Sequence, residues 1–123
     1  MRVPILKQQD FLIASVQEGL SDIQWQELRD DLSAKVGQYR TFGVIVDISS
    51  LDVLDSYATR TLRSIAYITA LRGARTVVVG IQPDVAYSMV RLGLTLENIE
   101  TALDLEDGLA ILSTLREGGG GPA

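Results

Sequence analysis

The run Gly43-Val44-Ile45-Val46 limits the possible folds more than any other stretch of the chain. Three consecutive β-branched residues with no polar residue between them predict a strand buried on both faces, as in the parallel sheets of α/β proteins. Asp47 marks the carboxyl end of this strand. A loop over residues 48–54 follows, and the chain then enters a helical pattern at about Ser56. We therefore expect an α/β fold.

Strand-like and helix-like patterns alternate along the rest of the chain. Gln9 and Asp10 separate the first two strand-like runs, which is the spacing of a tight hairpin. The alternation after this hairpin predicts a mainly parallel sheet with one antiparallel edge pair and about four helices. The predicted strands are Val3–Gln8, Phe11–Val16, Gly43–Val46, Arg75–Gly80 and Asn98–Leu103, and the predicted helices begin after Ser21, at about Ser56, at Asp84 and after Asp104.

Apolar residues at helical spacing predict which faces of the first and third helices are buried. Ser21 and Gln24 have the spacing of a capping box, so we expect the first helix to begin there. Its expected buried stripe is Trp25, Leu28, Leu32, Val36 and Tyr39, and that of the third helix is Val85, Ala86, Met89 and Val90. Ser88 also lies on the third helix, and we interpret it as an exposed serine.

The predicted helix from Ser56 to about Arg72 carries two lines of mostly apolar side chains. The first line suits packing against the sheet and comprises Ala58, Leu62, Ile65, Ala66 and Thr69. The second line points largely elsewhere and comprises Tyr57, Ser64, Tyr67, Ile68 and Leu71. Either a neighbouring helix covers this second line or it is a surface for a partner protein, and the sequence leaves both interpretations open.

Ser56 is the candidate functional residue of the chain. Asp55 or Ser56 is the expected N-cap of the second helix, so Ser56 lies at a helix N-terminus beside the carboxyl end of a central strand. Backbone N–H groups and the helix dipole favour an anion at such a place, and a phosphoryl group on Ser56 fits it. Arg60, one turn further along, is its expected partner. The ordinary alternative is a serine that only caps the helix.

The composition argues against most other classes of function. The chain has 123 residues and a net charge of −5, and its eleven Lys and Arg residues are scattered along the sequence, so we expect one domain that binds no nucleic acid. The absence of Cys and His removes thiol and imidazole catalysts and the common zinc and haem ligands, so we expect no cofactor, no metal site and no enzyme activity. No apolar run approaches the ~18 residues of a membrane span, which predicts a soluble, cytoplasmic protein.

Asp47 raises one signalling alternative, because a phosphoacceptor receiver domain also has an aspartate at the end of a central strand. A receiver needs an acidic pair after its first strand and a lysine late in the chain, whereas Lys7 and Lys35 are the only lysines here. The sequence also has neither a G-x-S-x-G motif nor a glycine-rich phosphate loop. These absences disfavour a receiver, a serine hydrolase and a nucleotide hydrolase.

Three segments of the chain resemble STAS domains, the sulphate transporter and anti-sigma factor antagonist family. The pattern Val46-Asp47-Ile48-Ser49, a short loop, and then Asp55-Ser56 at the start of a helix is similar to the phosphorylation segment of that family. The segments 73–83 and 102–109 resemble its single-domain members in the bacterial stressosome. The resemblance implies a STAS fold over residues 1–117, and the glycine-rich residues 118–123 predict a flexible tail.

The resemblance also implies a phosphorylation-switched scaffold in stress response signalling, with no catalytic activity. Such a scaffold assembles with larger STAS paralogues into a large oligomeric complex, sequesters a switch serine/threonine kinase, and releases the kinase when Ser56 is phosphorylated. We expect Asp55, Tyr57 and Arg60 to contribute to the surface that meets the partner. The alternative within the family is a simple anti-sigma factor antagonist, which binds an anti-sigma kinase directly.

Overall fold

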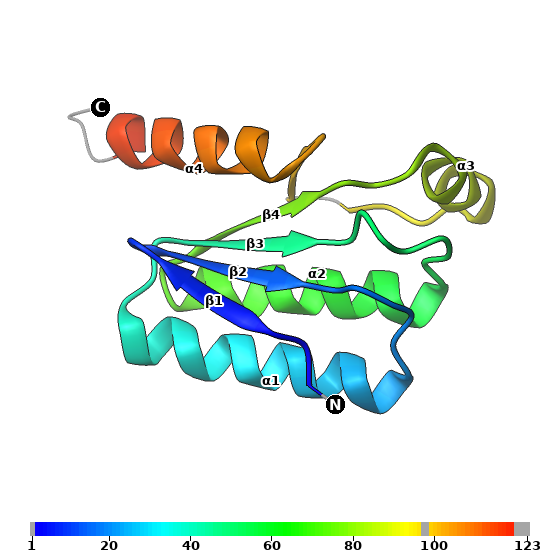
Figure 1. Ribbon diagram of the computed structural model, residues 1–123, viewed down its shortest axis with the longest axis horizontal. Helices are drawn as coiled ribbons and strands as arrows, with labels where there is room; N and C mark the ends of the chain where they lie inside the picture. Colours follow the sequence, from blue (N-terminus) through cyan, green and yellow to red (C-terminus); the bar gives the residue numbers. More distant parts are fainter. Residues whose placement is uncertain (1, 97–98, 120–123) are drawn as a thin grey trace.

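The computed structural model describes residues 2–96 and 99–119 as a five-stranded sheet with helices on both faces (Figure 1). The strands lie side by side in chain order, from β1 to β5. β1 (Ile5–Gln8) and β2 (Phe11–Ser15) form an antiparallel hairpin at one edge. The other strands run parallel to β2 and are β3 (Gly43–Asp47), β4 (Arg75–Val79) and β5 (Glu100–Ala102). The predicted α/β fold with an antiparallel edge pair is confirmed.

The described helices divide between the two faces of the sheet and one of its ends. α1 (Asp22–Tyr39) and α2 (Ser56–Leu71) pack on one face, and α4 (Leu105–Gly119) covers the other (Figure 1). α3 (Pro83–Leu92) lies beyond the carboxyl ends of the parallel strands. The first two residues of the expected tail, 118 and 119, are the last residues of α4, and residues 120–123 lie outside the described part of the chain. Asn98, the expected start of β5, is outside it too.

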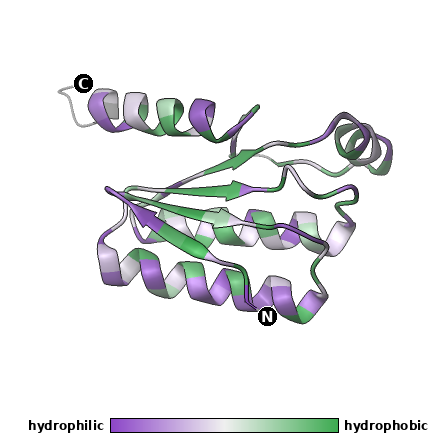
Figure 2. Ribbon diagram, in the orientation of Figure 1, coloured by the Kyte–Doolittle hydropathy of each residue, from purple (hydrophilic) through white to green (hydrophobic). Residues whose placement is uncertain are grey.

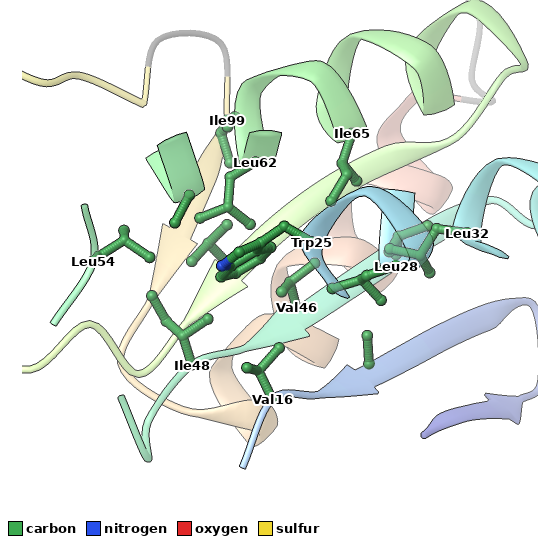
Figure 3. Close-up of a cluster of buried hydrophobic side chains, with 14 of the residues drawn as sticks. Val16, Trp25, Leu28, Leu32, Val46, Ile48, Leu54, Leu62, Ile65 and Ile99 are labelled. Carbon is green, nitrogen blue, oxygen red and sulfur yellow. The ribbon is translucent and has the colours of Figure 1, made fainter. Parts of the chain in front are cut away.

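The two faces of the sheet bury apolar side chains in separate clusters. Alternate residues of β3 enter alternate clusters, so that Val44 and Val46 meet the α1 and α2 side while Ile45 meets α4. Figure 3 shows Trp25 of α1 lying among Leu62 of α2 and Val46 of β3. In Figure 2 the strands are mostly hydrophobic and the outer faces of the helices mostly hydrophilic, as expected for a three-layer fold.

Side-chain hydrogen bonds cap the starts of α1, α2 and α4, close to where the sequence predicts them. Ser21 and Gln24 form the predicted capping box of α1, in which each side chain accepts a hydrogen bond from the other residue's backbone N–H. Asp104 accepts a hydrogen bond of 2.9 Å from the Asp107 backbone N–H at the start of α4. Asp55 is the N-cap of α2, which resolves the choice between Asp55 and Ser56.

Three residues predicted to be buried are exposed, namely Tyr39, Ala86 and Val90. Because α3 lies at the end of the sheet, only Val85 and Met89 on one narrow stripe of that helix are buried, and Val90 is 79% exposed. Tyr39 is in the last turn of α1 and is 40% exposed. Its ring lies 5.8 and 5.9 Å from the ammonium nitrogens of Lys7 and Lys35, within the range of cation–π attraction.

Candidate functional site

The loop between β3 and α2 positions Ser56, and buried residues hold this loop against the core. Ile48, Leu51 and Leu54 are each 3% exposed or less, whereas Val53 is 75% exposed. The chain therefore reaches α2 by a path in which apolar side chains point inward at intervals of three residues. Such a loop presents the start of α2 at a fixed place on the surface.

Hydrogen bonds within the carboxyl edge of the sheet stabilise the beginning of the same loop. The Asp47 carboxylate accepts hydrogen bonds from the Ser49 backbone N–H at 2.9 Å and from the Ser49 hydroxyl at 2.7 Å. The Gln82 side-chain amide donates to the Ser49 carbonyl at 2.7 Å from the neighbouring β4–α3 loop. Asp47 is therefore engaged in a turn, which is a structural role.

Gly80 allows these two loops to approach each other closely. Its φ is +80°, in the left-handed region that favours glycine, and a Cβ placed on it would lie 2.6 Å from the Ser49 Cβ. Sequence reasoning assigned no site role to Ser49, Gly80 or Gln82. The Asp47-x-Ser49 spacing is typical of an Asx turn, so the sequence alone could have predicted the contact between Asp47 and Ser49.

Ser56 is the first residue of α2 and is exposed to solvent. The helix cap is made by Asp55, whose carboxylate accepts a 2.8 Å hydrogen bond from the Ala58 backbone N–H. Within residues 2–96 and 99–119 the Ser56 hydroxyl makes no hydrogen bond, so it is not needed for the cap. The interpretation of Ser56 as an ordinary capping serine is therefore wrong, and its hydroxyl is open to chemistry from outside.

Tyr57 and Arg60 lie next to Ser56 on the first turns of α2. Tyr57 is half-buried and contacts α1, where its hydroxyl accepts a hydrogen bond of 2.7 Å from the Gln26 side-chain amide. Arg60 is exposed, and its guanidinium carbon lies 6.0 Å from the centre of the Tyr57 ring. The ring therefore holds the positive charge of Arg60 close to the start of the helix.

The second line of α2 side chains is only partly covered in this structure. α1 packs along one flank and meets Tyr57, but Tyr67 and Leu71 are 68% and 71% exposed. An open groove on this side of α2 is lined by Arg60, Arg63, Ser64, Tyr67 and Ile68. A neighbouring helix thus accounts for the start of the line. Further along, Ile68 is half-buried, whereas Ser64, Tyr67 and Leu71 are exposed.

Carboxylates dominate the carboxyl edge of the sheet around Ser56. Asp52 and Asp55 flank the serine on the loop side, and Asp84 lies in the first turn of α3. In the described part of the chain no group of three or more His, Cys, Asp or Glu residues could hold a metal ion. A recess of about 150 Å³ beside Asp55 and Ala58 is too small for a nucleotide-sized ligand. The chemistry that this edge offers is an exposed hydroxyl in a mostly acidic surface.

Comparison with known proteins places this geometry in a family. The family model described as STAS domain matches residues 2–108. The chain belongs to the STAS domain family. This match includes the Ser56 loop and all four strand-to-helix transitions of the described chain, and it confirms the resemblance seen in the sequence. STAS domains of this kind are non-catalytic regulators.

Two solved structures are similar over almost the whole chain. RsbS from Moorella thermoacetica, carrying a serine-to-glutamate substitution, is 34% identical with a TM-score of 0.82, and the match covers 95% of this chain and 99% of that one. A chain from a structure of the stressosome, described as a signal integration and transduction hub, is 36% identical with a TM-score of 0.74 and coverages of 92% and 98%. The chain is therefore similar to stressosome proteins in sequence and in fold.

A curated relative is longer than this chain. The RsbT co-antagonist protein RsbRD of Bacillus subtilis is 31% identical over 67 residues, which are 54% of this chain and 24% of the relative. The chain thus spans about a quarter of the length of RsbRD. Within the described residues, no helix is both long enough and apolar enough to span a lipid bilayer.

Proposed function

We propose that this protein is a phosphorylation-switched scaffold of a stressosome-like complex. In this proposal it sequesters a switch serine/threonine kinase similar to RsbT and releases the kinase when Ser56 is phosphorylated. The observation that carries the proposal is the exposed, unbonded hydroxyl of Ser56 at the first position of α2, with the cap made by Asp55. Larger STAS paralogues similar to RsbRD are the proposed partners in assembly.

The electrostatics of the site support a switch that acts on an interface and leaves the fold intact. Phosphorylation adds a charge of about −1.5 to −2 at pH 7. The helix dipole and the exposed Arg60 guanidinium attract this charge, so the folded domain tolerates it. Asp52 and Asp55 repel it, and the Asp55 carboxylate already occupies the Ala58 N–H group. The phosphate is therefore directed toward solvent, where a docked partner would have to bury it.

The proposed partner surface combines Asp55, Tyr57 and Arg60 with the groove along α2. Tyr67 and Leu71 supply exposed apolar area there, and Arg60 and Arg63 supply positive charge. Aromatic and arginine side chains are the usual anchors of protein interfaces. A partner seated on this surface would lie directly beside Ser56, which is the arrangement that a serine switch requires.

The names of the similar proteins support the choice of partners. RsbRD is named as an RsbT co-antagonist, and a second similar chain comes from a stressosome structure. The RsbS neighbour carries a glutamate in place of a serine, which is a common substitute for phosphoserine. The alternative function is that of a simple anti-sigma factor antagonist that binds an anti-sigma kinase directly, with the same serine as its switch.

The direct test is phosphorylation of the full chain by the cognate switch kinase, followed by intact mass measurement. The wild type should gain one phosphoryl group and Ser56→Ala should gain none. Ser113→Ala, an exposed serine on α4 across the sheet, is the matched control and should be modified like the wild type. Full modification of Ser56→Ala would assign the switch to another residue.

A second measurement separates the two candidate functions. The purified chain is mixed with a paralogue similar to RsbRD and with the kinase, and the masses of the complexes are measured by light scattering. A large mixed complex that retains the kinase supports the scaffold. A small complex of this chain with an anti-sigma kinase, formed without the paralogue, supports the alternative.

A further inference from the structure

Basic side chains that are scattered in the sequence gather at the amino ends of the parallel strands, opposite Ser56. Arg40 follows the last residue of α1, Arg72 follows the last residue of α2, and Arg75 begins β4 (Figure 1). Lys7 and Lys35 flank the Tyr39 ring at the same end. We call these five residues the basic end. The topology brings them together, because α1 and α2 both run from the carboxyl edge of the sheet to its amino edge.

Arg40 and Arg72 line an open recess of about 470 Å³ together with Thr41 and Phe42. Gly37 in the last turns of α1 makes room for one of the two guanidinium groups, since a Cβ at this position would overlap the guanidinium of Arg72. Arg72 therefore lies over the end of α1, next to Arg40. Two planar guanidinium groups in one recess provide several N–H donors for a carboxylate.

The backbone of Arg40 is strained. Its φ and ψ are +50° and +49°, in the left-handed region that non-glycine residues rarely adopt. The helix dipole favours a basic residue anywhere in the last turn of a helix. It does not explain an arginine at the left-handed residue that ends α1, where glycine is the preferred residue.

The arginines of the basic end are not neutralised by ion pairs. Within residues 2–96 and 99–119, Arg40, Arg72 and Arg75 form no ion pair, whereas Arg2, Arg29 and Arg116 do. The chain as a whole has a net charge of −5. The nearby Asp10 carboxylate is paired with Arg116, and the residues that line the recess include no Asp or Glu. A positive recess of this kind is complementary to carboxylates from outside.

We propose that the basic end docks a carboxylate-rich segment of another protein. The recess is open, and its lining combines the two arginines with the apolar side chains of Val36 and Phe42, so it fits an extended acidic segment with some apolar character. A nucleic acid would be repelled by the net charge of −5 and by the acidic carboxyl edge. This second surface goes beyond the proposed switch, because it lies at the opposite end of the sheet and does not involve Ser56.

The test uses the full chain and a fluorescein-labelled peptide of alternating Glu and Ala, with binding measured by anisotropy at about 50 mM salt, where screening is weak. Arg40→Gly removes one guanidinium and suits the left-handed backbone. Gly37→Ala displaces the Arg72 guanidinium and favours the helix. We expect each variant to weaken peptide binding by about three- to tenfold, with an unchanged or higher melting temperature.

The matched control is Arg91→Gln, which removes one exposed positive charge on α3 at the other end of the molecule and should bind the peptide like the wild type. The proposal is overturned if Arg40→Gly and Gly37→Ala both bind the peptide with the affinity of the wild type. It is also overturned if none of the proteins binds the peptide. A competition experiment gives a further contradicting outcome: a single-stranded oligonucleotide of equal charge, or inorganic phosphate, displaces the labelled peptide at a lower concentration than unlabelled peptide does.

Discussion

The two ends of the parallel strands differ in charge and in the structural elements that carry their charged or reactive side chains. The carboxyl edge is acidic, and buried side chains such as Ile48 and Leu54 anchor the loop that carries its exposed serine. The amino edge is basic, and its arginines lie at the strained end of α1 and at the end of α2. Both ends use the same helices, since α1 and α2 begin at one end and finish at the other (Figure 1).

This difference follows from the direction of the helices. In a parallel sheet the helices on a face all run opposite to the strands, so their N-termini share one edge and their C-termini share the other. Carboxylates are favoured at the N-termini and guanidinium groups at the C-termini. The fold therefore separates charge into two surfaces, and each can serve a different partner. The following predictions alter one end at a time, from the largest expected effect to the smallest.

The largest loss of stability is expected from Gly80→Ala at the carboxyl edge. A Cβ there would lie 2.6 Å from the Ser49 Cβ, and the φ of +80° disfavours any side chain, so the free energy of unfolding should fall by about 2–4 kcal/mol. Gly93→Ala is the control, because its φ is +70° with open space around it, and it should cost about 1 kcal/mol. Equal losses in urea denaturation would mean that the two loops do not depend on their close contact.

Removal of the α2 cap by Asp55→Ala should lower the free energy of unfolding by about 1 kcal/mol, because the Ala58 N–H group loses its acceptor. Asp104→Ala removes the corresponding cap of α4 and should cost a similar amount. Thermal unfolding of both variants measures this. If Asp55→Ala is neutral while Asp104→Ala is not, then Ser56 can replace Asp55 as the cap and its hydroxyl is less available than we infer.

At the basic end, Arg40→Gly should raise the free energy of unfolding by about 0.5–1 kcal/mol, because glycine adopts the left-handed conformation without strain. Gln9→Gly in the β1–β2 hairpin is a matched control with a φ of +54°, and it should stabilise the protein to a similar extent. Urea denaturation compares the two. A loss of stability in Arg40→Gly alone would show that the arginine serves the fold, contrary to our account.

The smallest effect is expected from Arg116→Gln, which breaks the ion pair between α4 and Asp10 in the hairpin. Both side chains are about half exposed, so the loss should be about 0.5 kcal/mol or less and should vanish at high salt. Melting temperatures at low and high salt check this. A larger, salt-independent loss would mean that the ion pair is part of what holds the basic end together.

The sequence predicts the fold better than it predicts the surfaces. The β-branched run of β3, the capping box of Ser21 and the alternation of elements all follow from local chemistry, and each is confirmed. The errors at Ala86 and Val90 have one cause: periodicity shows that a helix has an apolar face, but not how much of that face the rest of the protein covers.

The candidate site was predictable only in part. The position of Ser56 at the start of α2 follows from the pattern of the sequence, whereas the contact of Gly80 with Ser49 depends on the packing of two loops 31 residues apart in the chain. The basic end was not predictable at all from spacing, since Arg40 and Arg72 meet only because α1 and α2 end at the same edge. Charge that is scattered in sequence can still be concentrated by topology.

The central claim is that a phosphoryl group on Ser56 breaks a protein interface without unfolding the domain. The most direct measurement is the affinity of the cognate switch kinase for the unmodified chain and for the stoichiometrically phosphorylated chain, with melting temperatures recorded for both. We predict that phosphorylation weakens binding by about a thousandfold, the cost of burying an unpaired charge, while the melting temperature changes by only about 2 °C or less. Equal affinity of the two forms, or a large fall in melting temperature together with the loss of binding, would contradict the account.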